Sequence, residues 1–541
     1  MPSAACVDCC KQSVTSQSKK KIELLPGDLE QLLALGIADW KTWPMHAKTV
    51  TKVNLAAIMD KVSPALASRF KQHYQYFSPQ FLSSVQASGK QSRVELLPGD
   101  VEQLLASGII EETDGEQTLT MHVFTVPETG KRRRRCICHT IDINDSAAAV
   151  EIELPDFLQI KHGHGPYTAL ADLSAWYYQI PLPQESRRYY RFSTGGKTYQ
   201  LTAVPMGQRQ AVGAAQTLSE SLVQLAQLPT NVKTTTYIDN FRFAAQDPLS
   251  VKDAWVKFSS TCDFYNATLN VDSGIAGESY DFLGIHFTQT TMALTEKTLQ
   301  KLTGALEELK HENLSLHQAI KIFGLFLFAA RILNYPLALV YYTFKFFRRR
   351  GRAFTFGWRK LTDKANIWPC INDELQKWSK HLLDNTPVSL KEKNPTAVLI
   401  TDASKWGWGA ILFKKDGSLN FTNGEWSAEQ RVRHINELEA LAAKLAVSTL
   451  QPPEELIILI DNTTAESAIR KKRSTNYWIN KIVADIPCLM VEHITSRSNV
   501  ADILSRGQLA SQGKAPVLGW KSAVRDATSN VLVHEIVNNI Q

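Results

Sequence analysis

Two groups of acidic residues follow one another along this chain of 541 residues. The first group is Asp172 and Asp239, and the second is Asp402, Glu439, Asp461 and Asp502. Carboxylates that converge in a fold can bind two divalent cations, and such a pair of cations supports the transfer or hydrolysis of phosphodiesters. Two such groups in tandem predict one chain that both builds and degrades nucleic acid.

The basic residues favour the same kind of partner. The net charge is +7, and basic residues gather at 19–21, 132–135, 348–350 and 471–473. Such clusters suit phosphate backbones, although a solvated face explains any one of them equally well. The length of the chain predicts three or four domains of roughly 100–200 residues each. A globular multidomain protein that binds nucleic acid is therefore expected.

The cysteines and the apolar segments indicate where in the cell the protein is located. Eight cysteines at irregular spacing predict reduced thiols rather than a disulfide framework. The N-terminus lacks the apolar run of a secretory signal. The apolar stretch 322–347 is interrupted by Arg331, Asn334 and Pro336, so it predicts two buried helices rather than a membrane span. These features predict an intracellular protein without a membrane partner, in the cytoplasm or nucleus, with an organelle left open.

One motif is duplicated near the N-terminus. Glu23–Ala34 recurs as Glu95–Ala106, and both copies contain Leu-Leu-Pro-Gly-Asp. Pro-Gly-Asp signals the start of a helix, so each copy predicts a short amphipathic helix with Asp28 or Asp100 as its N-cap.

The order of local patterns predicts an α+β multidomain fold. Strand-like and helical patterns alternate over 94–287, and 295–383 is mostly helical in pattern. Near residue 394 the pattern changes to three strands, at 397–402, 408–413 and 419–423, followed by helix, strand and helix. From residue 507 the chain is polar and irregular, with at most a terminal helix.

Four motifs carry the first acid group. They are Asp172-Leu-Ser-Ala-Trp-Tyr177-Tyr-Gln-Ile-Pro181, Val204-Pro-Met-Gly207 with Gln216, Tyr237-Ile-Asp239-Asn240 and Phe282-Leu-Gly-Ile-His-Phe287. In this order they resemble the palm motifs of reverse transcriptases. The resemblance implies a right-hand polymerase with fingers, palm and thumb.

The same resemblance implies roles for individual residues. Asp172 and Asp239 would bind two Mg²⁺ ions, with Mn²⁺ as an alternative, while a deoxynucleoside triphosphate reacts with a primer on an RNA template. Tyr177 would lie against the sugar and exclude a ribonucleotide. Further substrate contacts are implied for Gly207, Gln216 and Asn240.

Residues 108–144 resemble the fingers segment that grips the triphosphate. Arg135 aligns best with the family's arginine, and Lys131 is the preferred lysine. The run of basic residues leaves this register open, and a solvated basic hairpin is the alternative for every member of the run except Arg135.

The chain also departs from the reverse transcriptase pattern. The usual Tyr-x-Asp-Asp is Tyr-Ile-Asp-Asn here, Ala211-Val212 replaces Ser-Pro, and no lysine follows the hairpin at 270–274. Asp-Asn also suits a tight β-turn on conformational grounds alone. Two alternatives to an active polymerase therefore stay open: an enzyme with ribonuclease H activity only, and a domesticated, non-catalytic RNA-binding scaffold.

The second acid group lies in four motifs of the C-terminal half. They are Thr401-Asp402-Ala-Ser-Lys-Trp-Gly-Trp-Gly-Ala410, Asn436-Glu-Leu-Glu439-Ala-Leu-Ala442, Leu459-Ile-Asp461-Asn-Thr and Asn499-Val-Ala-Asp502-Ile-Leu-Ser-Arg506. They resemble ribonuclease H, which implies an endonuclease that cleaves the RNA strand of RNA–DNA hybrids with two Mg²⁺ ions.

The resemblance places the four acids on a first strand, a first helix, a strand end and a last helix. Two glutamates compete for the helix position. Glu439 has Ala442 and Ala446 on its own face, whereas Glu437 would have Lys444 there. Glu439 is preferred and Glu437 is the alternative. Four neighbouring carboxylates would repel one another strongly without cations, so a purely structural role explains the set poorly.

Among reverse transcriptases with ribonuclease H, the second half is most similar to tyrosine-recombinase retrotransposons, that is, DIRS-like and trypanosomatid VIPER-like elements. The expected domains are an N-terminal extension (1–92), fingers and palm (93–290), a helical thumb or connection (291–393), a ribonuclease H-like domain (394–506) and a tail (507–541). The oligomeric state stays open.

Overall fold

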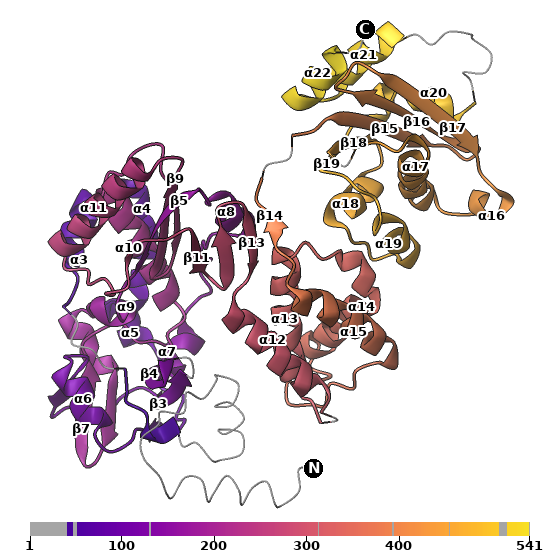
Figure 1. Ribbon diagram of the computed structural model, residues 1–541. Coiled ribbons are helices and arrows are strands. Elements are labelled where there is room, and N and C mark those ends of the chain that lie inside the picture. Colours follow the sequence, from indigo (N-terminus) through magenta and orange to yellow (C-terminus); the bar gives the residue numbers. More distant parts are fainter. Residues whose placement is uncertain are drawn as a thin grey trace, which may run out of the picture. The chain divides into compact units, whose positions relative to one another are not determined.

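The computed structural model describes residues 40–46, 51–128, 131–311, 313–391, 394–453, 455–507 and 517–539. The chain separates into two compact units, Met1–Glu278 and Ser279–Gln541. Mixed sheets and helices occur in both (Figure 1). The α+β, multidomain fold class predicted from the sequence is confirmed.

Three N-terminal helices belong to the main core of the first unit. They are α3 (Leu55–Lys61), α4 (Pro64–Tyr74) and α5 (Pro79–Ser84). Each begins at a side-chain cap, Asn54, Ser63 or Ser78, which accepts a hydrogen bond from the first turn. Their buried residues join the same hydrophobic core as the central sheet. These helices are thus part of the first unit rather than an appendage to it.

The second copy of the duplicated motif forms a helix, α6 (Asp100–Ala106), but Asp100 does not cap it. Gly99 precedes the helix in the left-handed region, at φ 86°, and Asp100 is buried. Its carboxylate accepts hydrogen bonds from both terminal nitrogens of Arg134, each at 2.7 Å. The predicted N-cap is therefore wrong, because a distant arginine provides the partner. The first copy, with Asp28, lies outside the described residues.

A four-stranded antiparallel sheet lies at the centre of the first unit, in the order β10-β5-β9-β8. Its strands are β5 (Tyr167–Asp172), β8 (Lys233–Tyr237), β9 (Asn240–Ala245) and β10 (Gly274–Ile275). The helices α10 (Ala211–Leu225) and α11 (Pro248–Phe264) pack on it. The β8–β9 hairpin turns at Ile238-Asp239, and Asp172 pairs with Asn240 in the register. The first acid group therefore lies at one end of this sheet.

Two smaller sheets complete the first unit. Strands β1 (Arg93–Glu95), β3 (Met121–Glu128) and β4 (Arg133–Thr140) form one, in the order β1-β3-β4. Strands β2 (Ile110–Thr113), β6 (Arg191–Thr194) and β7 (Lys197–Leu201) form the other, in the order β2-β7-β6. Short helices between them are α7 (Ile141–Ser146), α8 (Phe157–His162) and α9 (Trp176–Gln179).

The second unit begins with a small sheet and four long helices. The sheet contains β11 (Ser279–Phe282), β12 (Ile285–Thr288), β13 (Thr291–Leu294) and β14 (Val388–Ser389). The helices are α12 (Glu296–Leu309), α13 (Leu316–Ile332), α14 (Tyr341–Thr355) and α15 (Pro369–Asp384). The apolar stretch 322–347 divides between α13 and α14, as predicted. No helix among the described residues is both long and apolar enough to cross a membrane.

A five-stranded sheet organises the rest of the second unit, in the order β17-β16-β15-β18-β19. Its strands are β15 (Ala397–Ala403), β16 (Gly407–Lys414), β17 (Leu419–Glu425), β18 (Leu456–Ile460) and β19 (Met490–His493). On one face pack α17 (Ile435–Leu450), α18 (Thr463–Lys471) and α19 (Tyr477–Val483). Strand β15 is buried along its whole length, as expected for a strand covered on both faces.

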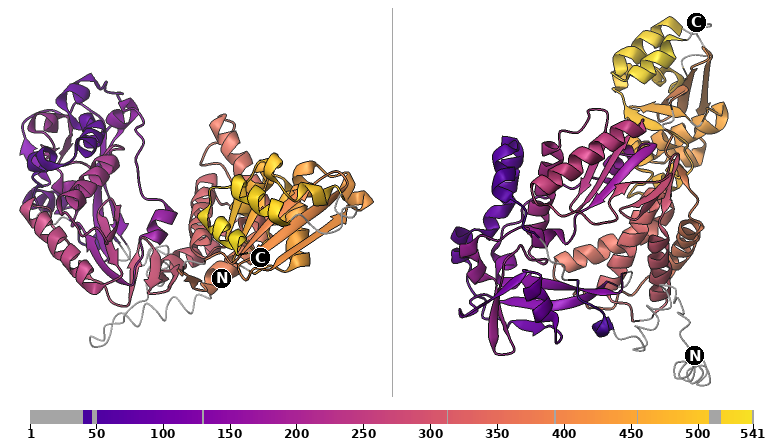
Figure 2. Two further views of the ribbon diagram at one scale, coloured as in Figure 1. Left: turned by 90° about the horizontal axis from the view of Figure 1, so that it is seen from above. Right: turned by 60° about the vertical axis from the view of Figure 1, so that its left-hand side comes forward.

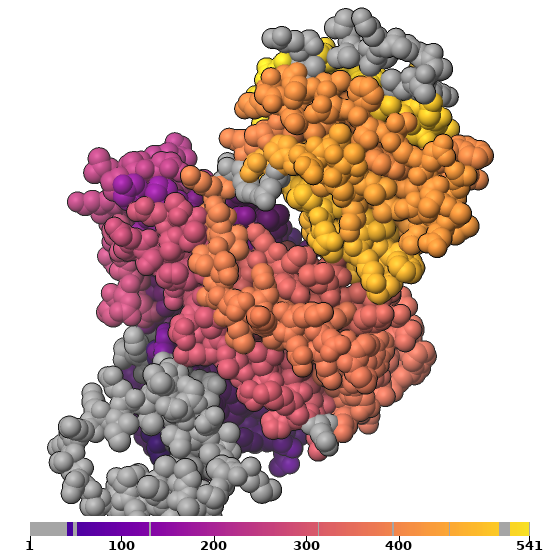
Figure 3. All heavy atoms as spheres, turned by 45° about the vertical axis from the view of Figure 1, so that its right-hand side comes forward, coloured from indigo at the N-terminus to yellow at the C-terminus, as the bar shows by residue number. Residues whose placement is uncertain are grey.

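The other face of this sheet is covered by the C-terminal residues. Helices α21 (Val517–Ala527) and α22 (Val531–Asn538) place Trp520, Val533 and Ile536 against Ile400 and Ile411. Both views of Figure 2 show these yellow helices against the sheet, and the yellow surface adjoins the orange surface in Figure 3. The sequence predicted an irregular tail from residue 507 in which a terminal helix was allowed. Residues 517–538 instead form two helices, which complete a hydrophobic core.

Candidate active sites

Three of the four acids of the second group converge at one edge of the five-stranded sheet. Strands β15 and β18 are parallel, with Thr401 opposite Ile460, so the next residues lie side by side: Asp402 within β15 and Asp461 directly after β18. Helix α17 packs on β15 and brings Glu439 to them. One carboxylate oxygen from each of Asp402, Glu439 and Asp461 lies within 4.8 Å of the others.

The structure distinguishes the two glutamates of α17 by their partners. Glu437 accepts a hydrogen bond from Asn476 at 2.8 Å and lies 3.7 Å from the Arg433 guanidinium. Glu439 is buried beside Asp402 and Asp461, and its Oε2 atom has no hydrogen-bond partner. Glu439 is thus the glutamate that joins the acid cluster.

The electrostatics of this cluster are those of crowded, buried carboxylates. Burial, followed by the charges of Asp402 and Asp461, raises the pKa of Glu439 to about 9. Burial also raises the pKa of Asp402 to about 6, and the charges of Asp461 and Asp502 add to this rise. An opposing positive charge would reverse both shifts. The cluster therefore has the oxygen ligands of a divalent cation site, and no positive charge of a described residue lies within the cluster to compensate its negative charge.

Asp502 lies beside this cluster rather than within the three-acid group. It begins α20 (Asp502–Ser505), and Arg506 donates to its carboxylate at 2.9 Å. Gly409 lets α20 approach, because a Cβ there would lie 2.4 Å from the Leu504 Cβ. Just before α20, Asn499 donates to Asp402 Oδ1 at 3.0 Å. Asn499 is the first residue of the motif that contains Asp502, but sequence reasoning assigned it no role.

The first acid group is a pair at the end of the central sheet. Asp239 has its pKa raised to about 6 by burial and then by the charge of Asp172. Burial likewise raises the pKa of Asp172. Asn270 donates to Asp172 Oδ2 at 2.6 Å, and Asn240 donates to Asp239 Oδ1 at 2.8 Å. Each carboxylate thus has an amide neighbour. Sequence reasoning missed Asn270, which has no spacing signal relative to Asp172.

Three residues with implied substrate contacts occupy different settings. Tyr177 is partly buried, and burial together with the nearby charge of Asp239 raises its pKa to about 12. Gln216 is buried, and it donates to Thr236 O and accepts from Ile238 N, so it holds the hairpin backbone in place. Gly207 lies at φ +126°, where a Cβ would be 2.6 Å from Cys138 O. Gln216 thus contacts the backbone of the hairpin, and Gly207 allows a close approach to the backbone of β4.

The basic run is divided by the alternation of strand β4. Arg134 points into the core, toward Asp100, whereas Arg133 and Arg135 both donate to Glu128. Burial opposes ionisation of Glu128, but these hydrogen bonds outweigh it and hold its pKa at about 2. The positive charges of Lys131, Arg135 and Arg133 partly offset the rise that burial causes in the pKa of Asp172, so these three side chains lie near the first acid pair. Sequence reasoning missed Arg133 as a member of this set.

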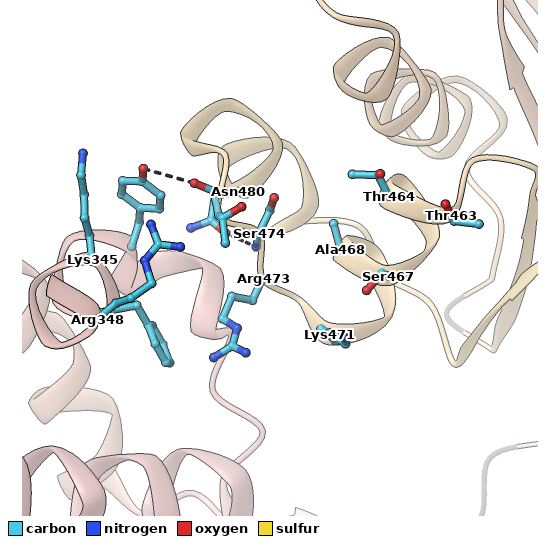
Figure 4. Close-up of a pocket in the computed structure, with 13 residues that line it drawn as sticks. Lys345, Arg348, Thr463, Thr464, Ser467, Ala468, Lys471, Arg473, Ser474 and Asn480 are labelled. Carbon is cyan, nitrogen blue, oxygen red and sulfur yellow. Dashed lines mark hydrogen bonds between the residues drawn. The ribbon is translucent and has the colours of Figure 1, made fainter. Parts of the chain in front are cut away.

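A basic groove of about 520 Å³ lies within the second unit. Helix α14 lines one side with Lys345 and Arg348, and α18 with the segment after it lines the other side (Figure 4). The lining includes Thr463, Thr464, Ser467, Lys471 and Arg473. Because Thr463 is two residues after Asp461, the groove begins close to the three-acid cluster in the chain.

Comparisons with known proteins find partial similarities. No family model matches the chain. A stretch of 130 residues is 27% identical to the retrovirus-related Pol polyprotein from transposon 412 of Drosophila melanogaster. It covers 23% of this chain and 10% of that polyprotein, so the chain matches only a small part of this relative's length.

Two solved structures show similarity over more of the chain. One is the foamy viral protease-reverse transcriptase dRH in complex with double-stranded DNA, at 13% identity and a TM-score of 0.47, covering 83% of each chain. The other is the foamy viral protease-reverse transcriptase in complex with an RNA/DNA hybrid, at 13% identity and a TM-score of 0.46. That match covers 83% of this chain and 64% of the other.

Proposed function

We propose that this chain is an RNA-directed DNA polymerase with ribonuclease H activity that serves the replication of a retrotransposon of the tyrosine-recombinase kind. The observation that carries the proposal is the convergence of Asp402, Glu439 and Asp461 within 4.8 Å, with a buried and unpartnered Glu439 oxygen. A structural role does not account for this arrangement, because the two buried carboxylates of Asp402 and Glu439 and the partly buried one of Asp461 repel one another.

In the nuclease site, Asp402, Glu439 and Asp461 would hold the cations, and Mg²⁺ is the expected ion because carboxylate oxygens are its preferred protein ligands. When bound, such a cation pair activates water and stabilises the leaving oxygen. Asn499 fixes the orientation of Asp402. Arg506 holds Asp502 at the edge of the site, where its carboxylate adds negative charge.

In the polymerase site, Asp172 and Asp239 would hold the cations, and Lys131, Arg133 and Arg135 would face the triphosphate. The charges of these basic residues already act on Asp172. The ring of Tyr177 lies near Asp239, where it would limit the room for a 2′-hydroxyl. Gln216 orients the hairpin that carries Asp239.

The basic groove supports a nucleic-acid substrate for the nuclease. Hydroxyl and cationic side chains from two sides suit a phosphate backbone, and the groove includes the first turn of α18, directly after Asp461. An RNA–DNA hybrid is the proposed substrate class.

Cleavage of a labelled RNA–DNA hybrid tests the nuclease. We expect Mg²⁺-dependent cleavage by the wild type and background cleavage by Asp402→Asn. Asp416→Asn is the matched control, because Asp416 lies in an exposed turn after β16, where it accepts a hydrogen bond from Ser418 N and is far from the acid cluster, since Asp402 pairs near the other end of β16. Equal cleavage by the wild type and Asp402→Asn would assign the activity to a contaminant.

Primer extension on an RNA template tests the polymerase. We expect a Mg²⁺-dependent DNA product that Asp172→Asn abolishes and that Asp253→Asn retains, since Asp253 only forms a surface ion pair with Lys257. Absence of a product from the wild type, with hybrid cleavage intact, would reject polymerisation.

An enzyme with ribonuclease H activity only is the second candidate. The observation that favours it is the engagement of Asp172 and Asp239 by the Asn270 and Asn240 amides, whereas Glu439 Oε2 is unpartnered. Hybrid cleavage without primer extension would select this candidate. RNA binding that persists when both activities are absent would favour a non-catalytic scaffold.

A further inference from the structure

The C-terminal end of α14 combines exposed aromatic rings with a cluster of basic side chains. Phe354, Phe356 and Trp358 are 47%, 64% and 77% exposed. The rings of Phe356 and Trp358 stack, with centroids 5.1 Å apart. A single exposed apolar side chain is ordinary, but a cluster of large exposed rings is typical of an interaction surface.

The backbone at the C-terminal end of α14, which carries these rings, is held in a defined conformation. Gly357 adopts φ +71°, Gly357 N donates to Phe354 O, and Trp358 N donates to Ala353 O. This pair of hydrogen bonds is a Schellman motif, which fixes the backbone after the last turn of a helix. The motif usually buries its hydrophobic residue, but here Trp358 stays exposed. The rings are therefore presented to solvent at little further cost in conformational entropy.

The charge along this stretch is mostly positive, and the next carboxylate in the sequence, Asp363, accepts a hydrogen bond from Lys360 N at 2.9 Å. Between residues 341 and 362 the sequence contains no Asp or Glu, and its basic residues are Lys345, Arg348, Arg349, Arg350, Arg352, Arg359 and Lys360. Within the described part of the chain, none of them forms an ion pair with a carboxylate. Burial, then the charge of Arg359, lowers the pKa of Arg350. These cations repel one another, and a polyanion would relieve that repulsion.

We propose that this basic-aromatic end of α14, residues 348–360, binds single-stranded nucleic acid. Phe354, Phe356 and Trp358 stack on unpaired bases, and the flanking arginines contact the phosphates. A single strand is favoured over a duplex because duplex bases are already stacked on one another and offer no free faces. The binding needs neither catalytic site, so it goes beyond the proposed activities.

Binding is measured by the fluorescence anisotropy of a labelled oligo(dT) or oligo(U) strand, with EDTA present so that neither acid site can act. Replacing Phe354, Phe356 and Trp358 together by Ser should raise Kd at least about tenfold, since each stacked base contributes substantially. A control triple variant replaces three other exposed apolar residues by Ser. They are Leu249, Phe264 and Val531, whose exposed fractions are 76%, 76% and 66%. That control should leave Kd unchanged.

Salt dependence separates stacking from charge. The loss of affinity in the aromatic variant should be the same at low and high salt, whereas Arg352→Gln with Arg359→Gln should reduce the slope of log Kd against log salt by about 1.4, that is, by about 0.7 for each phosphate contact to a single strand. The difference in fluorescence between the wild type and Trp358→Phe should be quenched by oligo(U). This quench reports on Trp358 even if the triple variant fails to fold.

Three outcomes would overturn the proposal. The first is unchanged single-strand affinity in the aromatic variant with no quench of Trp358. The second is an equal loss of affinity for a duplex of the same length. The third is an aromatic variant that no longer binds vesicles of phosphatidylcholine and phosphatidylserine, which the wild type binds, but that still binds the oligonucleotide. This result would assign the patch to a lipid surface. Loss of cleavage or extension in Asp402→Asn or Asp172→Asn bears on the proposed function alone.

Discussion

Replacing Glu439 by Gln should stabilise the cation-free protein at neutral pH. In the folded chain burial and two neighbouring acids raise the pKa of Glu439 from 4.5 to about 9. The unfolded chain therefore releases this proton at a lower pH than the folded chain does. Without a cation, the contribution of Glu439 to the unfolding free energy is fully present below pH 4.5 and is lost as the pH rises toward 9.

The size of this effect follows from the linkage relation. From pH 4.5 to pH 7 the carboxyl group contributes roughly 1.4 kcal/mol per pH unit, so the loss at pH 7 is about 3 kcal/mol. For a domain of about 150–250 residues, a loss of about 3 kcal/mol in the unfolding free energy corresponds to a decrease of roughly 6–12 °C in Tm. Gln cannot ionise, and its amide can donate to Asp402 or Asp461.

Differential scanning calorimetry from pH 5 to pH 9, in EDTA and in Mg²⁺, measures the effect. Wild-type Tm should fall with rising pH in EDTA and recover in Mg²⁺, because a bound cation stabilises the folded state. Glu439→Gln should melt higher than the wild type in EDTA at pH 7 and gain less from Mg²⁺. Glu437→Gln is the matched control on the same helix, since Glu437 pairs with Arg433 and Asn476 and should leave the Mg²⁺ gain intact.

The reasoning is refuted if Glu439→Gln melts at or below the wild type in EDTA at pH 8. It is also refuted if Glu439→Gln keeps the whole Mg²⁺ gain, because the cluster would then not be the cation site.

Three further perturbations test the packing around the sites. Trp520→Ala should lower the unfolding free energy by about 3–5 kcal/mol, because Trp520 is 3% exposed, whereas Trp478→Ala, at 48% exposed, should cost far less in the same thermal melt. Asp100→Ala leaves Arg134 buried without its partner and should cost about 3–5 kcal/mol; adding Arg134→Met should recover most of this in urea unfolding. Gly409→Ala pushes α20 away from the acid cluster and should slow hybrid cleavage by about 10–100-fold at saturating Mg²⁺, measured by initial rates.

Local patterns anticipated the elements that carry both acid groups. The apolar runs before Asp402 and Asp461 predicted strands, and β15 and β18 confirm them. The helix after residue 434 and the division of 322–347 were also predicted, because periodicity and breaking residues act within a few residues of chain. Such signals are strong where a segment is long and buried.

Short amphipathic segments were harder to predict. Helices α21 and α22 have 11 and 8 residues, and their apolar positions are interspersed with polar ones. Helices of this length are marginal on their own, and burial against the sheet stabilises them. Their existence therefore depends on a partner surface whose β15 and β16 residues lie more than 100 residues earlier in the sequence.

The sequence alone determined which residue types are available and in which order, including the acids of both sites and the basic run before the first. Tertiary structure decided which of them meet. Helix periodicity already favoured Glu439 over Glu437, and the packing of α17 brought Glu439 to the acid cluster. Only the tertiary structure divided the basic run between Asp100 and Glu128 and gave Asp172 the Asn270 amide. The physical reason is that side-chain partnership depends on strand register and helix packing, which join residues far apart in the chain and leave no trace in local spacing.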